Sequence, residues 1–145
     1  MPLLLARWTA ASTLSRWRIA GLAFVFLWFF LGGIAHFALT SVEMRIVPPW
    51  IALPRAAIIV SGVCELLGAA GVIWWRTRRA AGVSLFALTV AVTPANIYML
   101  QHYQLFGLPY WVLLARLPLQ LALLALITWS AIVPAAAPGT TSSAR

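Results

Sequence analysis

Four polar side chains in otherwise apolar segments have the clearest potential for chemistry. They are His36, Glu65, Asn96 and Arg116, one in each of four apolar runs, and Gln120 follows Arg116 by one helical turn. A histidine and a carboxylate that face one cavity can move protons on a bound molecule. An arginine can hold a carboxylate, an enolate or a quinone oxygen. Ionisable groups in apolar spans are costly unless they are paired, protonated or hydrated, so they indicate a functional site.

The composition determines what surrounds these residues. Of the 145 residues, 63% are hydrophobic and 8% are charged. A soluble domain of this size could not bury so much apolar surface, so the chain is expected to be an integral membrane protein of one domain whose main partner is the lipid bilayer. The net charge of +8 comes from ten arginines without a lysine. These arginines mostly flank apolar runs, as topology signals do, which argues against nucleic-acid binding.

The apolar runs predict an all-α fold, a bundle of four transmembrane helices. A residue rise of about 1.5 Å makes each run long enough to cross a bilayer. A cytoplasmic interfacial segment is expected to precede the bundle at 1–18 and a disordered cytoplasmic tail to follow at 134–145, with the transmembrane domain at 19–133. The expected helices are 19–40, 56–75, 81–100 and 108–133.

Prolines predict two departures from straight helices. The segment from Val47 to Pro54 holds three prolines yet stays apolar, so it is expected to form a cap along the extracytoplasmic membrane surface, anchored by Trp50. Pro94 is expected to kink the third helix. The arginine distribution sets the orientation, because seven arginines fall on the side of the termini and two, Arg45 and Arg55, on the other. Both termini are therefore expected in the cytoplasm.

The helical rise also predicts how deep the polar residues lie. His36 and Asn96 are expected roughly 6 Å below the outer helix ends, Arg116 roughly 10 Å and Glu65 roughly 13 Å. All four then lie in the outer half of the membrane. This match in depth predicts an outward-facing polar pocket under the cap. Arg116 is the first expected partner of Glu65, and if these two do not touch, Glu65 is expected to be protonated or paired with His36.

Three interpretations of this pocket are open. In the structural one, the Glu65–Arg116 ion pair, with His36 and Asn96 bonded to it, fixes the helix register. In the second, His36, Glu65, Asn96, Arg116 and Gln120 bind a ligand. In the third, His36 and Glu65 are the catalytic acid and base of a small enzyme. No metal site is expected, because the spacing of His36, His102, Glu65 and Cys64 is not that of metal ligands. Haem would require a second axial ligand at the depth of His36.

Six short motifs in this order resemble the DoxX family of small bacterial membrane proteins. They are Gly33-Ile34-Ala35-His36-Phe37, Pro48-Pro49-Trp50 with Pro54-Arg55, Ser61-Gly62-x-x-Glu65-x-x-Gly68-Ala69-x-Gly71, Arg78-Arg79-x-Ala81-Gly82, Pro94-Ala95-Asn96-Ile97-Tyr98-Met99 and Arg116-Leu117-Pro118-Leu119-Gln120.

The resemblance implies a four-helix membrane bundle in the bacterial cytoplasmic (inner) membrane. The family takes its name from a subunit of a thiosulfate:quinone oxidoreductase, and some of its members are linked to membrane redox complexes. The resemblance therefore implies a subunit that binds a lipophile or a quinone beside a membrane oxidoreductase partner. The alternative is a small membrane enzyme that performs isomerase-type acid/base chemistry on a lipophilic substrate. Quinone is the one cofactor that the resemblance suggests.

Overall fold

The structure, a computed structural model, describes residues 14–134. The expected interfacial segment therefore lies outside the described residues up to position 13, and so does the expected tail from position 135 onward. Within the described range the chain is helical and has no strand, so the prediction of an all-α fold is confirmed. Four helical spans are long and apolar enough to cross a membrane. Their outward faces carry exposed large apolar side chains, as a lipid-embedded bundle requires.

The observed spans begin and end within a few residues of the expected ones. They are α2 (Arg16–Ala38), α4 (Pro54–Ile73), α5 (Arg78–Ala91) continued by α6 (Thr93–Gln101), and α7 (Tyr110–Ile127) continued by the π-helical turn η2 (Thr128–Ile132). Two short elements, α3 (Thr40–Glu43) and the 3-10 turn η1 (Tyr103–Leu105), lie in the connections at one end of the bundle.

Three spans begin two or three residues earlier than expected, and for α2 and α4 the local reason is clear. Ser15 caps α2, because its hydroxyl accepts a hydrogen bond from the backbone N–H of Arg18 at 3.3 Å. Pro54 begins α4 rather than preceding it, because the first turn of a helix needs no N–H donor at that position.

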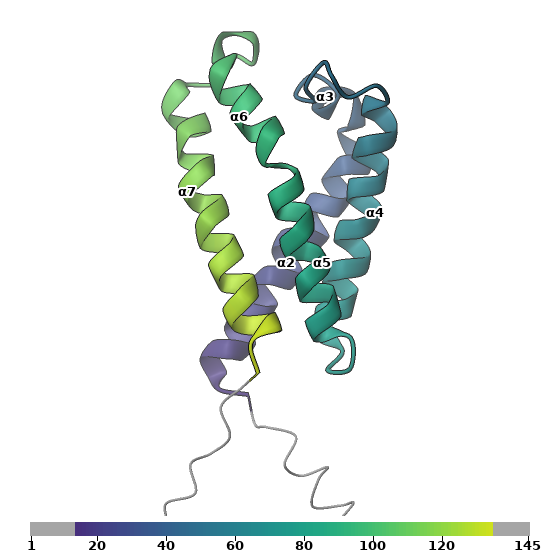
Figure 1. Ribbon diagram of the computed structural model, residues 1–145, viewed down its shortest axis with the longest axis vertical. Coiled ribbons are helices and arrows are strands. Elements are labelled where there is room, and N and C mark those ends of the chain that lie inside the picture. The colour runs from purple at the N-terminus through teal and green to yellow at the C-terminus, as the bar shows by residue number, and fades with distance from the viewer. Residues whose placement is uncertain (1–13, 135–145) are drawn as a thin grey trace, which may run out of the picture.

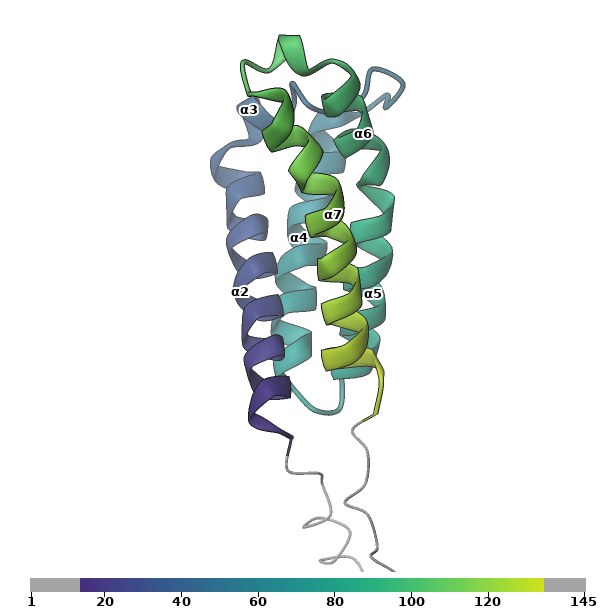
Figure 2. The ribbon, with the colours of Figure 1, turned by 90° about the vertical axis from the view of Figure 1, so that its left-hand side faces the viewer.

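The spans alternate in direction and form a ring in the order α2, α4, α5 with α6, and α7. Figures 1 and 2 show this arrangement, in which α4 and α7 lie diagonally across the bundle. Helix α2 is tilted within the ring. Its first turns pack against the end of α7, and its last turns pack against α4. We call the end with α3 and η1 the cap end, and the opposite end, where residues 14 and 134 lie, the terminal end.

The hydrophobic core lies toward the terminal end. All four spans contribute to it, and its buried residues are Val25, Phe29, Ala69, Val72, Leu85, Leu123, Ile127 and Ala131. Glycines allow the helices to approach one another. A Cβ added at Gly68 would collide with the side chain of Leu85, and one at Gly82 would lie 2.8 Å from the Cβ of Ala131. The close packing of this end holds the four spans together.

Two arginines at the terminal end bond to helix carbonyls that have no intrahelical partner. Arg18 is buried, and it donates from Nη2 to the carbonyl of Trp129 at 2.7 Å and from Nε to that of Ser130 at 3.3 Å. Arg78 donates from Nε to the carbonyl of Val72 at 3.0 Å, near the end of α4. These bonds satisfy carbonyls that a helix end would otherwise leave free.

The kink follows the sequence prediction, and so does the position of the cap over one end of the bundle. The third span breaks at Val92, where Pro94 removes a backbone donor, so the kink is confirmed. Pro48 of the cap is fully buried at the cap end. Trp50 meets Tyr98 of α6 edge-on, with ring centroids 5.7 Å apart. The cap therefore extends from the α2 and α4 side of the bundle to α6.

Candidate functional site

Two adjoining cavities occupy the half of the bundle nearer the cap. The first, the cap chamber, has a volume of about 430 Å³ and lies beneath residues 46–51 of the cap. The second, the inner chamber, has a volume of about 180 Å³. Five residues line both chambers, namely Glu65, Leu88, Val92, Asn96 and Arg116. The two chambers therefore meet at the level where three of the predicted polar residues lie.

His36 lies between two carboxylates on one side of the cap chamber. Its Nδ1 is in hydrogen-bond contact with Oε2 of Glu43, and its Nε2 lies 3.4 Å from Oε1 of Glu65. The side chains of these residues are mostly buried, with exposed fractions of 20% for His36, 18% for Glu43 and 14% for Glu65. An imidazolium has an N–H donor at each ring nitrogen, so a protonated His36 can serve both carboxylates.

The backbone around His36 explains how these groups meet. The short helix α3 folds back over the end of α2 and brings Glu43 to the histidine ring. The hydroxyl of Thr40 donates to the carbonyl of His36 at 2.6 Å and secures this turn. On the other side, a Cβ at Gly32 would lie 2.5 Å from Oε2 of Glu65, and one at Gly62 would lie 2.8 Å from the Cβ of His36. Glycine at both positions leaves the space that the carboxylate and the imidazole fill.

Glu65 has one oxygen without a partner. Its Oε2 is buried and accepts no hydrogen bond from any residue that the structure describes. The Glu65 side chain lines both chambers, whereas this oxygen is itself buried and lies close to Gly32 of α2.

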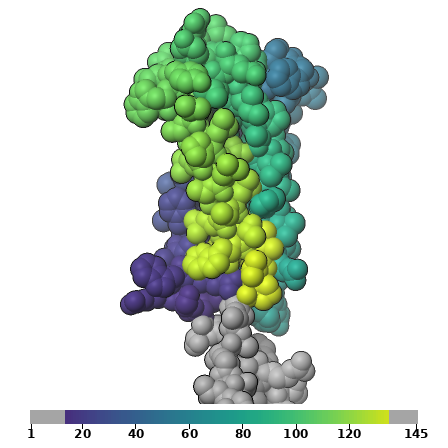
Figure 3. Space-filling view, turned by 60° about the vertical axis from the view of Figure 1, so that its left-hand side comes forward, coloured from purple at the N-terminus to yellow at the C-terminus, as the bar shows by residue number. Residues whose placement is uncertain are grey.

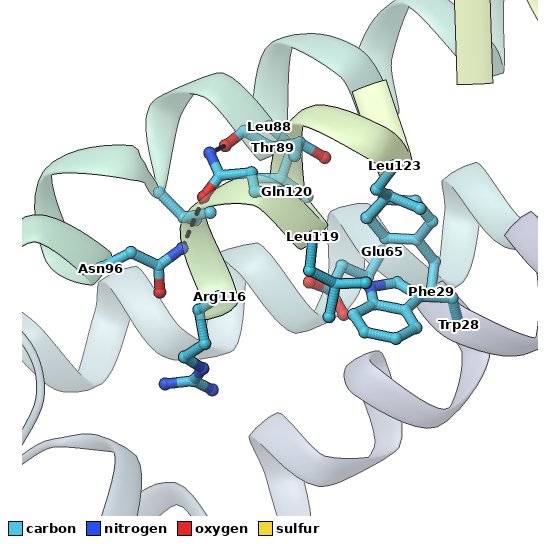
Figure 4. A pocket seen from close by; sticks show the side chains of 11 residues that line it. Trp28, Phe29, Glu65, Leu88, Thr89, Asn96, Arg116, Leu119, Gln120 and Leu123 are labelled. Carbon is cyan, nitrogen blue, oxygen red and sulfur yellow. Dashed lines mark hydrogen bonds between the residues drawn. The ribbon is translucent and has the colours of Figure 1, made fainter. Parts of the chain in front are cut away.

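The opposite wall carries a second polar network, between α7 and the kinked third span. Asn96 donates from Nδ2 to Oε1 of Gln120 at 2.7 Å. Gln120 in turn donates from Nε2 to the carbonyl of Thr89 at 2.8 Å and to the hydroxyl of Thr93 at 2.5 Å. Figure 4 shows the first two of these bonds. Gln120 is buried and therefore joins α7 to both sides of the break at Val92.

Arg116 faces the chambers, but it does not contact its expected partner, Glu65. The sequence predicts an ion pair with Glu65, and this prediction is wrong: among the described residues no carboxylate lies within 4.0 Å of the guanidinium, which donates from Nη1 to Sδ of Met99 at 3.2 Å. A thioether is a weak acceptor. The cause is the helix arrangement, since α4 and α7 lie diagonally across the bundle, whereas α2, which carries His36, lies beside α4.

The structure thus brings together the five residues that the sequence singled out. His36, Glu65, Asn96 and Arg116 line the cap chamber, and Glu65, Asn96, Arg116 and Gln120 line the inner chamber. Their role in ligand binding stays a prediction. Sequence reasoning did not single out Glu43, which the structure places beside His36. Two features of the sequence could have indicated Glu43: it is one of only two acidic residues in the chain, and it follows His36 by seven residues.

The other candidate metal ligands lie elsewhere. Cys64 is exposed on the surface of α4, and His102 bonds through Nδ1 to the carbonyl of Tyr98 at 2.9 Å. The carboxylates of Glu43 and Glu65 meet opposite nitrogens of the His36 ring and so do not converge on one point. Within residues 14–134 no group of three metal-ligating side chains is placed to hold an ion.

Comparison with known proteins assigns the family. A family described as a domain of unknown function (DUF8561) matches residues 22–139. The chain belongs to this family. The matched range contains all four polar residues and the whole of both chambers' lining. No curated protein and no solved structure matches the chain.

Proposed function

We propose that this membrane protein binds a lipophilic molecule with an oxygen-bearing head group, of the quinone or carboxylate type, in the two chambers. The observation that carries the proposal is Arg116. Its guanidinium faces a cavity of about 430 Å³ and has only a thioether as a hydrogen-bond acceptor among the described side chains. A cation in this position favours a ligand that supplies oxygen acceptors.

The remaining lining fits such a head group. Asn96 and Arg116 line both chambers, and His36, with its two carboxylate partners Glu43 and Glu65, lines the cap chamber. Residues Val47, Pro48 and Ile51 of the cap provide apolar walls. A few convergent polar groups within apolar walls are typical of small-molecule sites.

The motifs that resemble the DoxX family support a proposal in which this binding role belongs beside a membrane oxidoreductase. In this proposal the protein is a lipophile- or quinone-binding subunit, and the partner supplies the electrons for any redox step. The proposed location is the bacterial cytoplasmic membrane. Arg16, Arg76 and Arg79 at the terminal end support an orientation with both termini in the cytoplasm, and Arg45 and Arg55 lie at the cap end.

A second candidate function rests on the Glu43–His36–Glu65 cluster. A histidine between two carboxylates, one of which has an unpartnered oxygen, can accept and return a proton. This arrangement supports acid/base chemistry of the isomerase type on a lipophilic substrate. Such a reaction needs no external oxidant, because the proton removed from one carbon is returned to another.

Substitution of Arg116 by leucine tests the binding role. We expect Arg116→Leu to weaken binding of decylubiquinone or decanoate about 10- to 100-fold, because a charge-assisted hydrogen bond contributes about 1.5–3 kcal/mol. The free energy of unfolding should change by less than about 1 kcal/mol, since no ion pair within the described residues is broken. Titration calorimetry of the purified protein in detergent measures the affinity.

Arg55→Leu is the matched control. Arg55 is exposed at the same end of the bundle and lines neither chamber, so its loss should leave both affinities unchanged. Equal weakening by the two substitutions would point to nonspecific attraction between charges. Absence of saturable binding of both probes to the unmodified protein would overturn the proposed function.

The orientation has its own test. In a Cys64→Ala background, a cysteine at Gln104, which is exposed in η1, should react in intact cells with a reagent that cannot cross the membrane. A cysteine at Thr77, in the connection at the terminal end, should react only after permeabilisation. The reverse pattern would show that the cap end faces the cytoplasm.

A further inference from the structure

A third cavity lies on the outer face of the bundle, between α2 and α7. It is a groove of about 240 Å³ whose lining is apolar. Its lining residues are Phe24, Trp28, Leu119, Ala122, Leu123 and Leu126. Figure 3 shows the purple surface of α2 beside the yellow-green surface of α7 on the face where these helices meet. In a membrane-embedded bundle this face lies against lipid.

The tilt of α2 produces this groove. Near the terminal end, α2 and α7 are in close contact: a Cβ at Gly21 would lie 3.0 Å from the ring of Trp129 and 3.3 Å from Leu126. Towards the cap end, α2 leaves α7 and packs instead against α4, where Gly33 and Gly62 allow close approach. A wedge-shaped opening between α2 and α7 follows from this divergence, and the groove lies where it begins.

The groove adjoins the inner chamber. Trp28, Leu119 and Leu123 line both cavities, so these side chains lie between the lipid-facing groove and the inner chamber, which Glu65 also lines. Figure 4 labels Trp28, Leu119 and Glu65 among the side chains that line the inner chamber. Trp28 and Leu119 are partly exposed, Trp28 at 42% and Leu119 at 48%.

We propose that the ligand enters the inner chamber sideways from the bilayer, between α2 and α7, and that its apolar chain remains in the groove. The ligand is then an amphiphile with one oxygen-bearing head and one flexible apolar chain, such as a prenyl or an acyl chain. This inference rests on the proposed function and adds the route and the class of the ligand. The head reaches Arg116 and Asn96, and the chain lies against Phe24 and Ala122.

The occupant follows from the surroundings of the groove. A groove with this apolar lining offers no hydrogen-bond partner to a polar group, and its outer side faces lipid chains. A chain that moves from lipid into the groove changes its surroundings little, so the groove selects by shape rather than by added hydrophobic affinity. A ligand that entered from the cap end would instead have to carry its chain through water.

Filling the groove tests the inference. We expect Ala122→Phe to weaken binding of decylubiquinone at least 10-fold, because the added ring occupies the space of the chain. Binding of the same benzoquinone head without its decyl chain should change by less than about twofold. Ala125→Phe is the matched control, because Ala125 is exposed on α7 and lines none of the three cavities. It should change neither affinity.

A second measurement uses the unmodified protein. A quinone with a photoreactive diazirine on its chain should label peptides that contain Phe24, Trp28 and Ala122, and excess decylubiquinone should abolish this labelling. Competed labelling at the cap residues 46–51 would overturn the lateral route, and so would unchanged decylubiquinone binding by Ala122→Phe. Failure of decylubiquinone, its tail-free head and decanoate alike to bind the unmodified protein would instead overturn the proposed function.

Discussion

Replacement of His36 by leucine should lower the free energy of unfolding by about 3–5 kcal/mol, because it leaves mostly buried carboxylates without their partner. His36 meets Glu43 on one ring nitrogen and Glu65 on the other, and these are the only two acidic residues in the chain. Neither has another basic partner within 4.0 Å in the described part of the chain. Denaturation by sodium dodecyl sulfate in mixed micelles measures the loss.

A double-mutant cycle identifies the cause of this loss. Glu65→Gln in the His36→Leu background should recover part of the stability, because it removes one stranded charge, and the His36–Glu65 coupling should exceed about 1 kcal/mol. The same cycle for Glu65 and Arg116 should give less than about 0.5 kcal/mol. A larger coupling for Glu65 and Arg116 would show that these two residues are the true pair. His102→Leu, at an exposed histidine, is the control and should cost less than about 0.5 kcal/mol.

The sequence predicted the properties that depend only on position along a helix, namely the bounds of each span and the depth of each residue. Apolar length and the helical rise determine where a span begins, where it ends and how deep a residue lies, so four spans and a common level of polar residues could be inferred. Glu65, Asn96 and Arg116 do line the same two chambers. The kink was also predictable, because Pro94 acts on its own helix.

The order of the helices around the bundle axis could not be read from depth. Glu65 and Arg116 have similar expected depths, yet they lie on helices diagonally across the bundle. His36, and not Arg116, contacts the Glu65 carboxylate. Glu43 was missed because no hydrophobic period encodes the fold-back of a four-residue helix. Arg18 was interpreted as a topology signal alone. In the structure it also bonds to the end of a helix distant in sequence.

The partners of Gln120 were not predictable either, because its sequence position gave its face on α7 but not which helix lies opposite that face. Replacing it by methionine should lower the free energy of unfolding by about 2 kcal/mol, because three hydrogen bonds at about 0.5–1.5 kcal/mol each are lost. Its partners are Thr89, Thr93 and Asn96. The Thr89 carbonyl lies just before the break at Val92, so the loss should also loosen the kink. Hydrogen exchange of the 89–96 segment, with denaturation, measures both effects.

Two further variants separate hydrogen bonding from shape. Gln104→Met makes the same substitution at an exposed glutamine whose amide donates one bond, to Tyr103 at 3.4 Å, and it should cost less than about 0.5 kcal/mol. Gln120→Glu keeps an acceptor for Asn96 but cannot donate to the Thr89 carbonyl while it is ionised. It should therefore destabilise the protein at least as much as Gln120→Met. If Gln120→Met costs no more than Gln104→Met, the kink is held by Pro94 and packing alone, and the polar network between α6 and α7 does not stabilise the wall of the inner chamber.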